Sequence, residues 1–89
     1  MPRNSIQLKP SEIKAAFDAA EMRRLFGPIL DVSAMMLLLR LSRRTLYFWI
    51  AQGRLDGTFR KRGKHHFFWR DRVIDRIFNG QNWETKNEI

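Results

Sequence analysis

Residues 41–50 read Leu-Ser-Arg-Arg-Thr-Leu-Tyr-Phe-Trp-Ile, and this stretch decides the fold that we expect for the chain. Three apolar side chains follow the i, i+3, i+4 spacing of one helical face: Leu46, Trp49 and Ile50. Ser42 stands at the N-cap position, where its hydroxyl can accept from the free N–H groups of the first turn. Gly53 follows the last periodic residue, as is common beyond a helix end. The sequence therefore predicts a short helix over 43–52.

A second short helix is expected just before it, over 31–39, with Asp31 as its N-cap. Only residues 40–42 separate the two helices. The spacing leaves the other side chains of the second helix facing outward: Arg43, Arg44, Tyr47 and Phe48. Two short helices joined by a tight turn, the second carrying exposed arginines, form a helix-turn-helix.

After Gly53 the apolar period changes from helical to extended. The runs 58–61 and 65–69 read as two strands of a hairpin around Gly63, which can take the positive φ of a tight turn. The tip of such a hairpin, or wing, carries basic side chains: Arg60, Lys61, Arg62, Lys64 and His65. Their spacing suits a phosphate backbone or a minor groove. Three aromatic residues are expected to pin the hairpin to the core: Phe59, Phe67 and Trp69.

The flanking segments complete a chain that we expect to be mainly α with a small β-hairpin. Residues 1–10 are predicted to be a flexible N-terminus, and 11–28 to hold one helix, over 11–26, with Ser11 as N-cap. The winged helix-turn-helix domain is predicted to span 29–80. Its last helix, over 72–79, has Asp71 as N-cap and ends at Gly80. Residues 81–89 are expected to be a loosely ordered tail, unless Trp83 docks on the body or on a neighbour.

The basic charge is concentrated in one part of the chain. Of 17 Lys and Arg and nine Asp and Glu, residues 40–72 hold ten basic and two acidic side chains, so the whole net charge of +8 lies there. A solubilising surface would not be localised in this way. The placement favours a polyanionic partner, most simply a nucleic acid backbone.

Several other classes of function are not favoured by the sequence. There is no cysteine, so disulfides and thiolate metal sites are excluded, and a cytoplasmic location fits. The apolar run 34–39 is too short to span a bilayer, and we see no signal-peptide core at the N-terminus. His65 and His66 are adjacent in a strand and point to opposite faces, which disfavours a shared metal ion. No catalytic spacing or nucleotide fingerprint is present, so we expect neither an enzyme nor a cofactor.

The order of these parts resembles the winged helix-turn-helix domains of the MerR-like and excisionase-like superfamily. The resemblance covers 30–80 and rests on five ungapped blocks: 31–34, 41–50, 53–55, 63–68 and 70–73. Two features depart from the pattern of the family. Phe48 occupies a usually polar position, where it could meet a thymine methyl group, a second protomer or the core. No dimerising coiled coil or effector domain follows, which points to the short excisionase-like type without a small-molecule effector; the helix over 11–26 lies outside the match.

The resemblance implies sequence-specific binding of double-stranded DNA by a nucleoid-associated protein. The helix would enter the major groove, and the wing would lie on the adjacent minor groove. The implied contacts of the helix are Ser42, Arg43, Arg44, Thr45, Tyr47 and Phe48. From the residues alone, an Arg at the start of such a helix can bond guanine bidentately, and Thr45 and Tyr47 suit phosphates. Arg54 is expected to contact the backbone.

Proteins of this kind serve as recombination directionality factors or as small transcription regulators of mobile elements. If the chain is an excisionase, we expect several copies to associate on DNA, and a recombinase is a candidate partner. Two other classes stay open. One is a basic RNA-binding module, in which residues 67–69 stack unpaired bases. The other is a protein-interaction adaptor, such as a phage assembly component.

Overall fold

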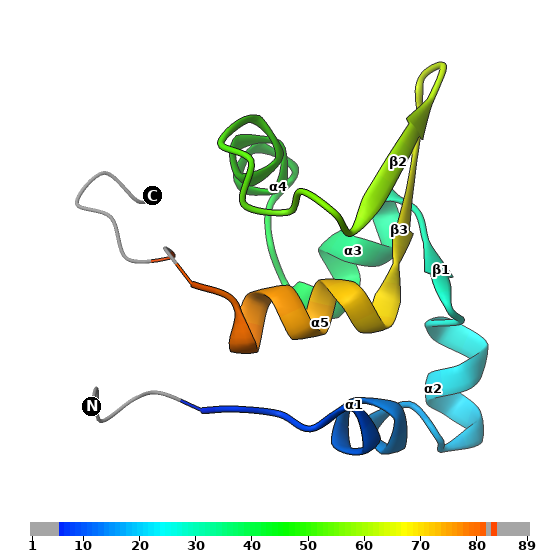
Figure 1. The fold of residues 1–89 in the computed structure, drawn as a ribbon. Coiled ribbons are helices and arrows are strands. Elements are labelled where there is room, and N and C mark those ends of the chain that lie inside the picture. The colour runs from blue at the N-terminus through cyan, green and yellow to red at the C-terminus, as the bar shows by residue number, and fades with distance from the viewer. Residues whose placement is uncertain (1–5, 82, 84–89) are drawn as a thin grey trace.

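The computed structural model describes residues 6–81 and 83 (Figure 1). Within these residues the chain forms five helices and a three-stranded antiparallel sheet, with overall extents of 38 × 34 × 20 Å. In chain order the elements are α1 (Pro10–Ala16), α2 (Ala20–Leu25), β1 (Ile29–Leu30), α3 (Val32–Leu39), α4 (Arg43–Ala51), β2 (Phe59–Arg62), β3 (His65–Trp69) and α5 (Arg70–Asn79). This mixed α/β arrangement is compatible with a winged helix.

The two helices predicted around the tight turn are present, with the predicted caps. The Asp31 carboxylate accepts from the Ala34 N–H at 2.8 Å, and the Ser42 hydroxyl accepts from the Thr45 N–H at 3.1 Å. Both caps are local signals, which explains why the sequence located α3 and the start of α4 closely. The turn between the helices passes through Arg40, which adopts a left-handed conformation with φ 56°.

The sheet contains one strand that the sequence did not predict. The predicted hairpin is β2 and β3, joined at Gly63 with φ 60°. The two-residue strand β1 adds to the other edge of β3, giving the order β1-β3-β2. Its register pairs Ile29 with Trp69 and Leu30 with Phe68. Leu30 and Phe68 are completely or almost completely buried, so β1 carries one core side chain into the sheet.

A single hydrophobic cluster joins nearly all the elements. Its buried members are Ile13, Phe17, Phe26, Leu30, Met35, Leu46, Leu55, Phe68, Val73 and Ile74. The N-terminal segment contributes Ile13 of α1 and the C-cap residues Phe17 and Phe26, so this segment packs on the core. Figure 1 shows α1 running beneath α5, with α2 leading up to β1.

The helix predicted over 11–26 is wrong in two respects. It begins at Pro10, with Lys9 as N-cap and the Glu12 carboxylate accepting from the Lys9 N–H at 2.8 Å. It also breaks at 17–19 into α1 and α2. No Gly or Pro in the sequence marks this break. The break allows Phe17 and Phe26 to contact the same side chain of α5.

That side chain is Arg70, and it also changes the start of α5. The prediction of Asp71 as N-cap is wrong, because α5 begins at Arg70 and its N-cap is Trp69. The buried Arg70 guanidinium donates to the Phe26 carbonyl at 2.8 Å and to the Asp71 carboxylate at 2.9 Å, and it lies 4.0 Å from the centroid of the Phe17 ring. Asp71 therefore partners Arg70 in the first turn.

Both ends of the described chain are tied to α5. The Leu8 N–H donates to the Asn79 side chain at 2.7 Å, and the Asn79 amide donates back to the Leu8 carbonyl at 2.8 Å. The N-terminal segment 1–10, which was predicted to be flexible, is thus held in place at Leu8 by these two hydrogen bonds. Residues 1–5 lie outside the described residues. Trp83 docks on the body, where its indole N–H donates to the Arg76 carbonyl at 2.9 Å and its ring meets Trp49 edge-on. The rest of the predicted tail beyond 81 lies outside the described residues.

No helix in the described part of the chain is both long and apolar enough to cross a membrane.

Candidate nucleic-acid interface

The first turn of α4 presents two arginines to solvent. Arg43 and Arg44 are both exposed, while Leu46 is completely buried on the opposite side. The Ser42 hydroxyl also donates to the Thr45 hydroxyl at 3.0 Å, so the predicted contact Thr45 is half-buried and already engaged in the cap. The core side of α4 fixes the helix, and the cap leaves Arg43 and Arg44 free to reach outward.

The next outward positions of α4 are aromatic. Tyr47 is 39% exposed, and its ring lies 5.7 Å from that of His66 on β3. Phe48 is half-buried and is not among the described side chains packed against the hydrophobic cluster. The structure therefore does not favour the core as the environment of Phe48, which leaves a thymine methyl group or a second protomer.

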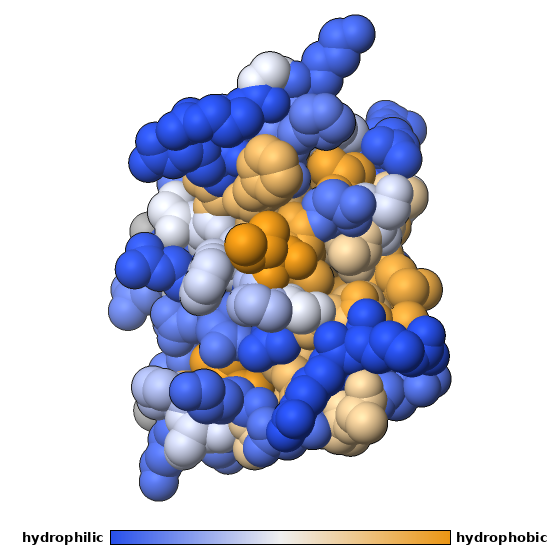
Figure 2. Space-filling model, turned by 90° about the vertical axis from the view of Figure 1, so that its right-hand side faces the viewer, coloured by the Kyte–Doolittle hydropathy of each residue, from blue (hydrophilic) through white to orange (hydrophobic). Residues whose placement is uncertain are grey.

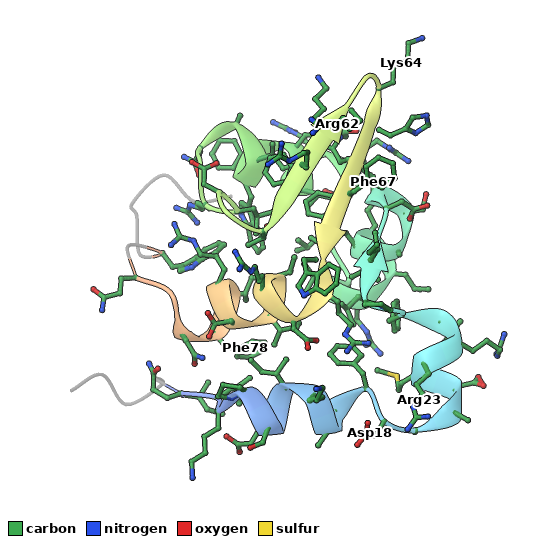
Figure 3. The ribbon with its side chains drawn as sticks, turned by 45° about the vertical axis from the view of Figure 1, so that its right-hand side comes forward. Asp18, Arg23, Arg62, Lys64, Phe67 and Phe78 are labelled. Atoms are coloured by element: carbon green, nitrogen blue, oxygen red, sulfur yellow. The ribbon has the colours of Figure 1, made fainter. Side chains whose placement is uncertain are left out.

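Strand alternation divides the basic side chains of the hairpin between two faces of the sheet. Lys61 pairs with His66, which contacts Tyr47, so Lys61 lies on the face that looks toward α4. Arg60 pairs with Phe67 and Arg62 with His65, and these four lie on the opposite, outer face. All five predicted basic residues of the hairpin are exposed: Arg60, Lys61, Arg62, Lys64 and His65. Figure 3 shows Lys64 extending from the tip, beyond Arg62.

A hollow of about 340 Å³ joins α4 to the hairpin. Its lining includes Arg43 and Tyr47 from α4, and Lys64 and His65 from the hairpin. Its third wall comes from the start of α3, where the Asp31 carboxylate is held by its cap hydrogen bond. The structure therefore brings part of the predicted helix contacts and part of the predicted hairpin contacts onto one concave surface.

His66 of β3 is buried where the hairpin packs against Tyr47 of α4. It is 8% exposed and its ring contacts those of Tyr47, Phe59 and Phe68. Burial, reinforced by the positive charge of Lys61, lowers the pKa of His66 below its usual 6.5. The neutral form is favoured, and its Nδ1 has no hydrogen-bond partner among the described residues.

Arg54 does not lie where the sequence predicted a backbone contact. It is 6% exposed, and its guanidinium lies 5.1 Å from the centroid of the Trp83 ring. Its backbone carbonyl accepts from the Arg76 side chain at 2.7 Å. We therefore correct the prediction: Arg54 follows α4 and contacts Trp83 of the C-terminal segment. Its neighbours in the sequence gave no sign that this arginine is buried.

The aromatic residues of the hairpin also differ from expectation. Phe67 and Trp69 do not pin the hairpin to the core, since they are 46% and 49% exposed. Phe68 does so, with Phe59 half-buried beside it at a ring separation of 5.2 Å. The signal was present in the sequence: one inward aromatic at 68 sends both neighbours outward.

The adjacent histidines lie on opposite faces of β3, His65 exposed and His66 buried. Among the described residues, no group of three or more His, Cys, Asp or Glu side chains is placed to hold a metal ion.

Searches against protein-family models, curated proteins and solved structures find no match to this chain.

Proposed function

We propose that this protein is a winged helix-turn-helix protein that binds double-stranded DNA in a sequence-specific manner. In this proposal α4 enters the major groove, and the β2–β3 hairpin is the wing on the adjacent minor groove. The observation that carries the proposal is the hollow shared by Arg43 and Tyr47 of α4 with Lys64 and His65 of the hairpin. The sugar-phosphate ridge between two grooves is the part of a duplex that such a hollow would receive.

The N-terminal turn of α4 carries the sequence preference in this scheme. Arg43 and Arg44 are exposed at the position where the second helix of such a motif meets base edges. An arginine there can bond guanine O6 and N7 together, a contact worth about 1–3 kcal/mol of discrimination. Tyr47 lies one turn further on and is suited to a phosphate oxygen.

The hairpin supplies affinity rather than sequence preference. Lys61 and Lys64 are exposed, and each is suited to neutralising one phosphate. Arg62 and His65 flank the turn at Gly63, where a narrow tip suits the minor groove.

Within this class we propose an excisionase-like recombination directionality factor, or a small transcription regulator, of a mobile element. One unit with a largest extent of 38 Å covers little DNA, so occupancy of a regulatory site would need several copies side by side. A second copy, and for an excisionase a recombinase, are the protein partners that this role implies.

Fluorescence anisotropy with two labelled duplexes tests the proposal. One duplex comes from beside the protein's own gene, where regulators of mobile elements often act, and the other is its scrambled sequence. We expect tighter binding to the native duplex, and Arg43→Ala or Arg44→Ala to reduce that preference by about 5–150-fold while the scrambled duplex is less affected. Lys64→Ala is the matched control, because loss of a phosphate contact weakens binding to both duplexes alike.

Equal affinity for the two duplexes, with equal effects of all three substitutions, would leave only a basic surface and would reject sequence-specific binding.

A further inference from the structure

The outer face of the sheet, turned away from α4, holds an open hollow of about 520 Å³. It is lined by Ile29, Gly57, Thr58, Phe59, Arg60, Phe67, Phe68, Trp69 and Arg72. Figure 2 shows hydrophobic side chains gathered in the middle of this side of the molecule, with hydrophilic side chains around them.

Three aromatic rings follow one another along this face of β3. His65, Phe67 and Trp69 are all exposed and alternate with buried positions. The His65 and Phe67 ring centroids are 6.3 Å apart. Trp69 follows on the same face, two residues further along the strand. The three exposed rings therefore lie on one face of β3, in the order in which the strand presents them.

The positive charges of this face stand beside the rings. Arg62 is the cross-strand partner of His65, and Arg60 is the partner of Phe67. Arg72, exposed in the first turn of α5, also lines the hollow and donates to the Gly57 carbonyl at 3.5 Å. Among the described residues that line the hollow, none is acidic.

The fold does not need these rings. Phe68 and Leu30 carry the core contacts of their strands, both at 1% exposure or less. Their neighbours Phe67, Trp69 and Ile29 are between 46% and 57% exposed. Exposed aromatics grouped on one surface mark an interaction site more often than a lone exposed apolar residue does.

We propose that this outer face is a second nucleic-acid site, which binds a single strand of DNA by stacking unpaired bases on Phe67 and Trp69. Arg60, Arg62 and Arg72 would neutralise the phosphates. A single strand repeats one flat ring and one anion per unit. This matches a face on which Arg62 and Arg60 pair with His65 and Phe67, and Arg72 lines the same hollow as Trp69. A second copy of this face would oppose arginines to arginines, so self-association through it is disfavoured.

The choice of DNA over RNA follows from the lining. A protein distinguishes RNA from DNA by contacts to the 2′-hydroxyl, which both donates and accepts. Among the residues that line the hollow, the one side-chain oxygen that could accept from it belongs to Thr58. Thr58 is buried, and its hydroxyl donates to the Leu55 carbonyl at 2.6 Å. The site goes beyond the proposed duplex binding. It shares Phe67 with the hollow beside α4, and Arg60 and Arg62 with the predicted hairpin contacts, whereas Trp69 and Arg72 belong to the outer face alone.

The test compares three labelled strands of equal length: oligo-dT, an abasic deoxyribose-phosphate strand and oligo-rU. Stacking predicts that the protein binds oligo-dT at least about tenfold more tightly than the abasic strand, which has the same charge but no bases. It also predicts that oligo-rU binds no more tightly than oligo-dT, because no free side-chain acceptor for the 2′-hydroxyl lines the hollow. Phe67→Ala with Trp69→Ala should remove the preference for dT over the abasic strand, and Phe67→Ala alone should reduce it. Circular dichroism shows whether each variant is folded.

Arg43→Ala with Arg44→Ala is the matched control, since it should weaken duplex binding and leave the preference for oligo-dT unchanged. Failure of the duplex proposal alone would therefore leave this result intact. Equal binding of oligo-dT and the abasic strand would overturn the proposal, as would an undiminished preference in the folded double variant. Tighter binding of oligo-rU than of oligo-dT would overturn the choice of DNA. Displacement of oligo-dT from this face by a glutamate- and leucine-rich peptide, bound more tightly than any strand, would point to a protein partner instead and would also overturn it.

Discussion

The two faces of the hairpin sheet are built from alternate residues of the same strands, yet they do different work. The face toward α4 carries His66 and Phe68, both buried, and it fixes the hairpin against the helix. The outer face carries Phe67 and Trp69, both about half exposed, and contributes little to the core. The comparison teaches that composition alone does not give the role of an aromatic or basic residue here. The face of the strand on which the residue lies decides its role, and this alternates from one residue to the next. Neighbouring residues therefore provide matched pairs for testing this.

The pair Phe68 and Phe67 tests the comparison with the largest expected effect. Phe68→Ala should lower the free energy of unfolding by about 3–5 kcal/mol, because it empties a completely buried site. Phe67→Ala, one residue away, should change it by no more than about 0.5 kcal/mol. Urea unfolding followed by circular dichroism measures both. Similar losses for the two variants would mean that the faces are not distinct.

The pair Lys61 and Arg60 tests whether charge is divided in the same way. Lys61→Ala should lower the affinity for duplex DNA and reduce the slope of log affinity against log salt by roughly one unit, as expected for one lost phosphate contact. Arg60→Ala should affect duplex binding less and single-strand binding more, since Arg60 lies on the outer face. Anisotropy titrations at several salt concentrations separate the two. If Arg60→Ala reduced the duplex slope as much as Lys61→Ala, the hairpin would act as one undivided basic tip.

The pair His66 and His65 gives the smallest effect. The pKa of His66 is lowered in the folded state by burial and by Lys61, so the unfolded chain binds the proton more readily. The stability that depends on neutral His66 is fully present above about pH 6.5 and is lost as the pH falls from there toward the lower folded pKa. His66→Phe should flatten the loss of stability between about pH 7 and pH 5, and exposed His65→Phe should retain it. Urea unfolding at these pH values checks the sign. An unchanged pH dependence in His66→Phe would assign it to other groups.

The parts of the fold predicted correctly from the sequence are those fixed by local signals. Asp31 and Ser42 each cap a helix from the adjacent turn, and Gly63 supplies the positive φ of the hairpin. The exposed arginines of α4 followed from helical spacing around Leu46. In each case a few neighbouring residues were sufficient to predict the local structure.

The parts that the sequence missed depend on distant contacts. The strand β1 has only two residues and exists because it pairs with β3 across the chain. The break between α1 and α2 is explained by Arg70, which lies more than 40 residues away from Phe26. Arg54 was expected at the DNA backbone because it is basic, whereas its burial depends on Trp83. For a candidate site residue, the face of the helix or strand on which it lies could be predicted when a buried residue of the same element was identified. Without such a residue it could not.

The most direct test of the central proposal is a titration of ¹⁵N-labelled protein with the native duplex, followed by amide chemical shifts. Duplex binding by α4 and the hairpin predicts the largest changes at 42–48 and 61–65, with little change at Ile29 and Arg72 on the outer side. Changes concentrated on the outer side, with 42–48 unaffected, would contradict the account.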